Sequence, residues 1–196
     1  AAGLVNQSVM VRLSTQDHNQ MTKMADYGTE GVFLSYCEHP EHIEHLCKMV
    51  RNRPVQSHSV TPDQEKYINR NPDNFVIAVG IESKIGHARL DDFLRISEID
   101  AIWVGPHDLS VNLGIPNEYE SSIFLDAVID IAKRTRAAGK SFIWCSPRLM
   151  MHKDVEMLKY GVNAVMFGPD TALLKSTVES TVKFIKGTTR APGQNA

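Results

Sequence analysis

An arginine and two carboxylates follow apolar segments of the sequence, and these residue types could carry chemistry. Arg12 lies near the end of SVMVRLS, Glu82 lies near the end of FVIAVGIES, and Asp108 follows AIWV and the dipeptide Gly105-Pro106. A buried carboxylate is costly without a cation or hydrogen-bond donors. Mg²⁺ and Mn²⁺ are commonly bound by one or two carboxylates, which leaves positions for water and substrate oxygens. We therefore predict that Glu82 and Asp108 bind one divalent metal ion, Mg²⁺ or Mn²⁺ with Co²⁺ as an alternative, and that Arg12 binds an anion.

Each of these residues also has a structural interpretation. Glu82 could cap a helix that starts near Ser83, because acids are favoured in a first helical turn. Arg12 could pair with a structural acid. Asp170 precedes a long helical pattern and is best interpreted as an N-cap. His107 is interpreted as a loop residue whose backbone matters more than its ring.

A second candidate metal site lies in the histidine-rich segment CEHPEHIEH, residues 37–45. His42 and His45 are three residues apart in a predicted helix, and Glu38 precedes His42 by four, so a surface zinc site is geometrically possible. The segment matches neither HExxH nor HxxEH. We therefore predict an exposed helix start, with these apolar residues facing inward: Ile43, Leu46 and Val50.

The rest of the chain alternates strand and helix patterns. Strand-type runs cover residues 8–14, 30–36, 75–83, 101–105, 141–146 and 163–168, and helical spacing covers 17–28, 39–52, 83–98, 119–139, 148–161 and 171–187. The runs are almost continuously apolar, as in strands buried on both faces of a sheet. Glycines stand where helices are expected to end, at Gly28, Gly139, Gly161 and Gly187.

This alternation predicts a parallel sheet in an α/β fold. The chain has no G-x-G-x-x-G after its first strand and no P-loop, so we favour a TIM-type (β/α) barrel over a dinucleotide-binding sheet. A complete barrel of this type usually has about eight βα units, and about six are visible here. We therefore expect about two N-terminal units outside this sequence. We predict one barrel domain over residues 1–187 and a flexible C-terminal tail over residues 188–196.

In such a barrel the active site lies where the strands end, on the C-terminal face. Arg12, Glu82 and Asp108 are therefore expected to converge on one mouth. The long connection at residues 53–71 is expected to be a functional loop of the barrel.

Composition limits the other classes of function. The net charge of −2 and pI near 6.5 provide no basic face for a nucleic acid. No apolar segment approaches the roughly 20 residues that cross a bilayer, so we expect no membrane partner. Three cysteines without a CxxC pattern fit a reducing, cytoplasmic compartment, and they are Cys37, Cys47 and Cys145.

Several of these segments together resemble one family. VGIES at 79–83, followed by IWVGPHDLSVNLGIP at 102–116, resembles the paired metal-ligand segments of HpcH/HpaI-type class II, metal-dependent pyruvate aldolases. VMVRLS at 9–14 resembles their strand with a catalytic arginine. DYGTEGVFLSYCEHPEH at 26–42 and NAVMFGPDTALLKS at 163–176 resemble further segments in the same order. The resemblance covers nearly the whole chain.

The resemblance implies a metal-dependent aldolase, a carbon-carbon lyase that cleaves a 4-hydroxy-2-oxo acid to pyruvate and an aldehyde through a metal-stabilised enolate. Arg12 would be catalytic and bind the 2-oxo acid substrate, and Glu82 with Asp108 would bind the metal. The turn Gly105, Pro106, His107 and Asp108 would bind substrate, with the last two backbone N–H groups on the pyruvate carboxylate. The expected assembly is a homo-oligomer, a trimer or hexamer.

The chain departs from the family pattern at three places. Gly80 replaces a glutamine, Ser35-Tyr36-Cys37 replaces Pro-Met-Val, and RPVQSHS at 53–59 replaces Arg-Gly-x-Gly. The family's basic histidine would precede Ala1, so the expected base is a metal-bound hydroxide or that histidine, for which His58 or His107 could substitute. Two alternatives follow: a condensing enzyme of the same family, in citrate-like or siderophore biosynthesis, or a degenerate barrel without catalysis.

Overall fold

Six strands form one parallel sheet in which each strand pairs with the next one along the chain. The computed structural model describes residues 8–13, 16–51, 75–147 and 151–188. The strands are β1 (Met10–Leu13), β2 (Gly31–Leu34), β3 (Val76–Gly80), β4 (Ala101–Val104), β5 (Ser141–Cys145) and β6 (Ala164–Met166). All six predicted strands are confirmed, and with them the parallel α/β class.

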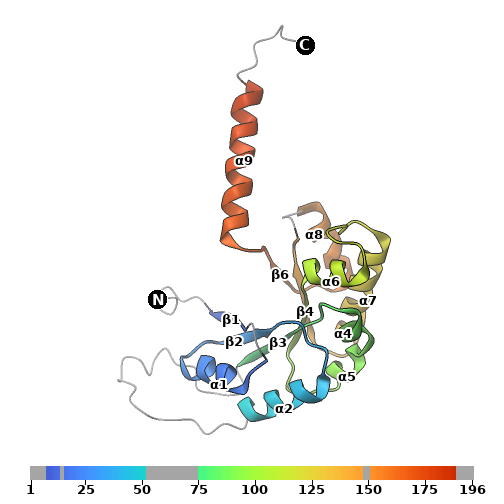
Figure 1. Ribbon diagram of the computed structural model, residues 1–196. Helices are drawn as coiled ribbons and strands as arrows, with labels where there is room; N and C mark the ends of the chain where they lie inside the picture. Colours follow the sequence, from blue (N-terminus) through green and yellow to red (C-terminus); the bar gives the residue numbers. More distant parts are fainter. Residues whose placement is uncertain (1–7, 14–15, 52–74, 148–150, 189–196) are drawn as a thin grey trace.

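Apart from the last one, the helices connect these strands and wrap around one face of the sheet (Figure 1). They are α1 (His18–Asp26), α2 (Pro40–Arg51), α4 (Lys84–Ala88), α5 (Leu90–Leu94), α6 (Pro106–Leu113), α7 (Ser122–Ala137), α8 (Met151–Met157), the short 3₁₀ helix η3 (Leu158–Tyr160) and α9 (Asp170–Thr188). The single helix predicted over 83–98 is wrong. The chain leaves helical geometry at Arg89, with φ −98° and ψ 12°, and forms α4 and α5 instead.

The glycine predictions hold at three of four positions. Gly28, Gly139 and Gly161 have φ of 79°, 76° and 89°, the left-handed conformation that ends a helix at low cost for glycine. Gly187 lies inside α9, which continues to Thr188, so the prediction there is wrong.

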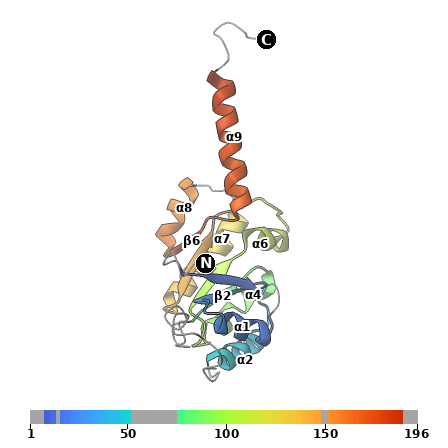
Figure 2. The same cartoon turned by 90° about the vertical axis from the view of Figure 1, so that its left-hand side faces the viewer.

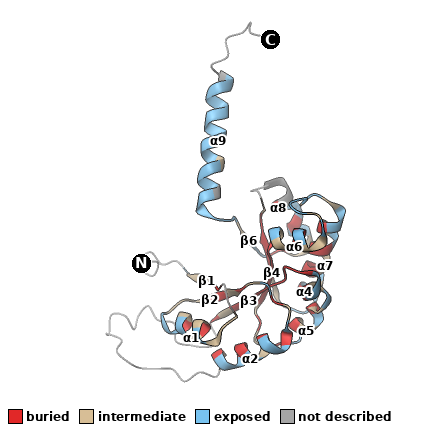
Figure 3. Cartoon of the chain, viewed as in Figure 1, coloured by how far each residue is buried: buried red, intermediate tan, exposed pale blue. Residues whose placement is uncertain are grey.

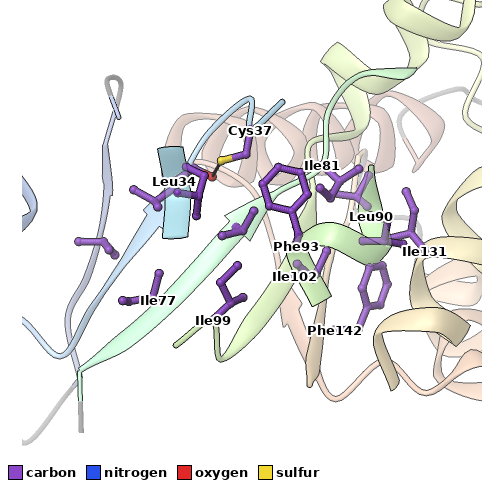
Figure 4. Packing of buried hydrophobic residues seen from close by; sticks show 14 of the residues in the cluster. Leu34, Cys37, Ile77, Ile81, Leu90, Phe93, Ile99, Ile102, Ile131 and Phe142 are labelled. Atoms are coloured by element: carbon purple, nitrogen blue, oxygen red, sulfur yellow. Dashed lines mark hydrogen bonds between the residues drawn. The ribbon is translucent and has the colours of Figure 1, made fainter. Parts of the chain in front are cut away.

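The main core lies between the sheet and the helices that cover it. Leu34, Ile77, Ile102 and Phe142 from the strands are fully buried with Leu90, Phe93 and Ile131 from α5 and α7 (Figure 4). Burying apolar surface is the largest favourable contribution to folding. This layer therefore fixes the positions of the strand ends.

The opposite face of the sheet carries a smaller apolar cluster. Its buried members are Ala78, Ala101, Trp103, Ile143 and Cys145, with Met10, Phe33 and Met166 partly buried against them. Burial on both faces is confirmed for β4, whose four residues are all buried. It is wrong for β1 and β6, the edge strands of the described sheet, because most of their residues are partly or fully exposed.

Helix α9 projects away from the rest of the molecule in two perpendicular views (Figures 1 and 2). It is exposed along its length (Figure 3), including the apolar residues Leu174, Val178, Phe184 and Ile185. Within the described residues, no helix is both long and apolar enough to span a bilayer.

Candidate active site

The parallel strands bring the predicted site residues to one end of the sheet. Arg12 lies in β1, Glu82 lies two residues after β3, and Asp108 lies in the first turn of α6, which follows β4. Strands β3 and β4 are neighbours, with Gly80 opposite Trp103. The register therefore places the two carboxylates at adjacent strand ends, as predicted.

Glu82 is a buried carboxylate, with only 1% of its surface exposed. Its Oε1 accepts a hydrogen bond of 2.8 Å from the backbone N–H of Tyr36. The interpretation of Glu82 as a helix cap is wrong, because Ser83 caps α4: the Ser83 hydroxyl accepts a 3.1 Å hydrogen bond from the N–H of Gly86.

Two glycines make room for this carboxylate. A Cβ added at Gly105 would lie 2.1 Å from Glu82 Oε2, and one added at Gly80 would lie 2.7 Å from Oε1. The Cβ at Gly80 would also lie 2.8 Å from Trp103 Cε2. Gly80, which replaces a glutamine of the family pattern, thus lies where the Trp103 ring and the Glu82 carboxylate leave no space for a side chain.

The electrostatics of Glu82 call for a cation. Burial, the largest cause, and the neighbouring Asp108 carboxyl together raise the pKa of Glu82 to about 7, against the lowering by the Tyr36 N–H and the Arg12 charge. Two carboxyl groups so close repel each other when both are ionised. A divalent cation between them would remove that repulsion, so the residues present fit a metal ion of the Mg²⁺ or Mn²⁺ type.

The turn before α6 offers backbone donors beside this pair. Helix α6 starts at Pro106, and its first intrahelical bond runs from the N–H of Leu109 to the carbonyl of Gly105. The preceding N–H groups of His107 and Asp108 have no acceptor within the helix, and the helix dipole makes this end attractive to an anion. The His107 ring instead contacts the Asn117 side chain, with Nδ1 3.1 Å from Oδ1.

Arg12 is exposed at the same end of the sheet. Its Nε donates a 2.7 Å hydrogen bond to Ser35 Oγ, and its guanidinium carbon lies 5.9 Å from the centroid of the Trp103 ring. Among the described residues Arg12 forms no ion pair, so the structural acid considered above is not found there. No described residue accepts a hydrogen bond from its remaining guanidinium donors, which could therefore bind a ligand.

Trp103 and Tyr36 are site residues that the sequence reasoning missed. Trp103 is held by a 3.2 Å hydrogen bond from its Nε1 to the carbonyl of Leu34 and by an edge contact with Phe33. Tyr36 lies in Ser35-Tyr36-Cys37, which replaces Pro-Met-Val of the family pattern. That replacement was the one feature of the sequence that could have indicated a role for Tyr36 in the site. Both residues touch Arg12 or Glu82.

The histidine-rich segment is an exposed helix start, as predicted. The apolar residues of this helix that were predicted to face inward, Ile43, Leu46 and Val50, are fully or almost fully buried. The histidines of the segment are exposed, and His42 Nε2 lies 3.0 Å from the carbonyl oxygen of Gln16. In the part of the chain that the structure describes, no group of three or more His, Cys, Asp or Glu side chains could hold a metal. The zinc alternative is therefore wrong for these residues.

Asp170 is the first residue of α9 itself, so its predicted N-cap role is wrong; its carboxylate accepts a 2.7 Å hydrogen bond from the N–H of the adjacent Thr171 and not from one further along the helix. The segment 53–59, the connection 53–71 and His58 lie outside the described residues.

Comparison with known families decides the classification. The model of the HpcH/HpaI aldolase/citrate lyase family matches residues 1–177. The chain belongs to this family. The predicted resemblance is therefore confirmed, and the HpcH/HpaI segments quoted above lie inside the matched range.

A curated relative agrees with the HpcH/HpaI assignment. A 2-keto-3-deoxy-L-rhamnonate aldolase of Escherichia coli O6:K15:H31 (strain 536 / UPEC) is 29% identical over 130 residues, which are 65% of this chain and 47% of the relative. The chain thus matches about half the length of this curated relative.

Two crystal structures share the fold. An HpcH/HpaI aldolase from Desulfitobacterium hafniense DCB-2 has a TM-score of 0.80 at 22% identity, over 100% of this chain and 77% of that one. The citrate synthase SbnG has a TM-score of 0.78 at 22% identity, over 95% of this chain and 75% of that one.

Proposed function

We propose that this HpcH/HpaI chain provides the site of a metal-dependent aldolase that cleaves a 4-hydroxy-2-oxo acid into pyruvate and an aldehyde. The observation that carries the proposal is the buried Glu82 carboxylate beside Asp108, within the electrostatic reach of Arg12. A carboxylate pair next to a cationic donor and free backbone N–H groups suits an anionic substrate that gains negative charge during reaction.

Glu82 and Asp108 would hold the metal. Bound there, a divalent cation would supply Lewis acidity to the 2-oxo and carboxylate oxygens of the substrate. Mg²⁺ and Mn²⁺ are the expected ions because both ligands are carboxylates, and Co²⁺ is an alternative.

The chain's own residues would orient the substrate and stabilise charge. The N–H groups of His107 and Asp108 would bind the substrate carboxylate at the start of α6, with Gly105 and Pro106 shaping that turn. In cleavage a base takes the proton of the C4 hydroxyl, that oxygen forms the aldehyde carbonyl, and the C3–C4 bond breaks with its electron pair left on the pyruvate half as an enolate. Arg12, held by Ser35 and Trp103, would donate to the oxygen on which that charge develops. The enolate then takes a proton at C3 to give pyruvate.

The test is a cleavage assay with 4-hydroxy-2-oxo acids in Mg²⁺ or Mn²⁺, in which pyruvate is measured by its reduction with lactate dehydrogenase and NADH. We expect metal-dependent pyruvate release that chelation with EDTA abolishes. Release at the same rate in EDTA, or no release from any 4-hydroxy-2-oxo acid, would contradict the proposal. Product analysis with oxaloacetate as acceptor separates cleavage from the condensing alternative.

We also propose that the sheet belongs to a TIM-type (β/α) barrel and that the functional unit is a homo-oligomer, a trimer or hexamer. The solved structures with TM-scores of 0.80 and 0.78 support the barrel. The exposed apolar residues of α9 support association, because patches of this kind commonly mark protein interfaces. The three cysteines are buried free thiols, which suits the cytoplasmic compartment proposed for the protein.

A further inference from the structure

Tyr36 has an unusual backbone conformation at the mouth of the proposed site. Its φ is 53°, in the left-handed region that is unfavourable for a bulky side chain, while 44% of the residue is exposed. Non-glycine residues in such conformations persist where their surroundings fix them, and they gather at ligand sites. The position of Tyr36 therefore calls for a functional explanation.

Four hydrogen bonds hold this backbone in place. The Gln16 side-chain Nε2 donates to the carbonyls of Ser35 and Tyr36, at 2.9 and 3.0 Å. The N–H of Tyr36 donates to Glu82 Oε1 at 2.8 Å, and the N–H of Cys37 donates to the carbonyl of Gly80 at 3.0 Å. The turn is thus tied to the carboxylate that would bind the metal.

The tyrosine hydroxyl is also positioned by a partner. Asn112 Nδ2 donates to the Tyr36 hydroxyl oxygen at 3.1 Å and to the carbonyl of Asp108 at 3.1 Å. The contact with the Asp108 carbonyl identifies this amide atom as the nitrogen. The Asn112 Oδ1 atom lies 3.5 Å from the Tyr36 hydroxyl, at the limit of a hydrogen bond. The hydroxyl proton is therefore available to a better acceptor.

Asn112, the partner of this hydroxyl, lies on the same helix as the proposed metal ligand Asp108. Asn112 lies one helical turn after Asp108 on α6, a rise of about 6 Å. The carboxylate and 2-oxo groups would already be held at Asp108, Glu82 and Arg12. We therefore expect the hydroxyl that Asn112 holds to face the carbons of the substrate beyond C3.

We propose that Tyr36, held by Asn112, determines specificity by donating a hydrogen bond to a hydroxyl on the aldehyde half of the substrate. The preferred aldehydes would carry a hydroxyl next to the carbonyl carbon, as sugar-derived aldehydes do, whereas an alkyl aldehyde would gain nothing from this donor. A site that hydrogen-bonds a substrate hydroxyl discriminates against an analogue that lacks it. This inference rests on the proposed aldolase function.

The experiment measures kcat/KM for pyruvate addition to glycolaldehyde and to acetaldehyde, which differ by one hydroxyl. We expect the wild type to prefer glycolaldehyde, and Tyr36→Phe and Asn112→Ala each to lower the glycolaldehyde-to-acetaldehyde ratio by about tenfold, the value of one net hydrogen bond. Tyr27→Phe is the matched control, since Tyr27 follows α1 and is 74% exposed, and its ratio should equal that of the wild type.

A separate measurement tests the underlying chemistry: exchange of the pyruvate methyl protons with D₂O, followed by NMR in the wild-type protein with Mn²⁺ or Mg²⁺. No exchange would overturn the proposed function and the inference with it. Exchange together with an unchanged ratio in both site variants would overturn the inference alone.

Discussion

Replacing Glu82 by glutamine should stabilise the metal-free protein while it removes metal binding. The carboxyl is buried and lies beside Asp108, so its ionised form is unfavourable in the fold unless a cation is present. Glutamine has nearly the same shape, and its Oε1 can still accept the N–H of Tyr36. If Glu82 is present to bind a metal ion, it should lower the free energy of unfolding of the metal-free protein relative to Glu82→Gln.

The magnitude and its pH dependence follow from the pKa of Glu82. Burial and Asp108 raise this pKa from 4.5 to about 7, and one pKa unit corresponds to about 1.4 kcal/mol. Ionising the carboxyl therefore costs the fold up to about 3 kcal/mol. Because the folded pKa is the higher one, the cost is absent below about pH 4.5, grows as the pH rises to about 7, and is complete above that.

Urea unfolding in EDTA at about pH 5 and about pH 8 measures this difference. We expect Glu82→Gln to have a larger free energy of unfolding than the wild type. This excess should be about 1–3 kcal/mol greater at about pH 8 than at about pH 5. Glu118→Gln, at an exposed position, is the matched control and should show no such dependence. A destabilised Glu82→Gln at pH 8 would refute the reasoning, because the ionised carboxylate would then be contributing to the fold.

Three further predictions address the cation donor, the opposite end of the sheet and α9. Arg12→Ala should lower kcat by about 10²–10³ with a smaller rise in KM, and Arg12→Lys should recover only part of the loss; full activity with a large loss of thermal stability would assign Arg12 a structural function instead. Asp100→Ala should lower the free energy of unfolding, measured in urea, by about 1–3 kcal/mol, because Asp100 Oδ2 accepts hydrogen bonds from Arg51 and from the N–H of Ile77, both at 2.7 Å. A changed Mn²⁺ affinity in this variant would contradict the claim that Asp100 lies apart from the metal site. Leu174→Glu on α9 should shift the protein toward monomers in sedimentation velocity, and a wild type that is itself a stable monomer at micromolar concentration would count against the proposed oligomer.

The strands and the two carboxylates could be predicted from the sequence because their signals are local. A continuous apolar run indicates a buried strand, and the carboxyl ends of parallel strands meet at one edge of the sheet. Glu82 and Asp108 follow two such runs, so their convergence requires only that β3 and β4 be neighbours.

The conformation of Tyr36 and the position of Trp103 depend on contacts that are distant in the sequence. Tyr36 donates to Glu82, 46 residues away, and Trp103 donates to Leu34, 69 residues away. The break between α4 and α5 likewise coincides with Arg89, which pairs with Glu41 of α2 at 3.0 Å. A periodic pattern carries no information about such contacts, because it reports which face of an element is buried and not what lies against that face.

Calorimetric titration with Mn²⁺ tests the central claim, that Glu82 and Asp108 together bind one divalent cation. The measurement compares the wild type with Glu82→Gln and Asp108→Asn, and Glu118→Gln serves as the exposed control. We predict a single site in the wild type and in the control, and a large loss of affinity in each of the two site variants. Undiminished Mn²⁺ affinity in both site variants would contradict the claim.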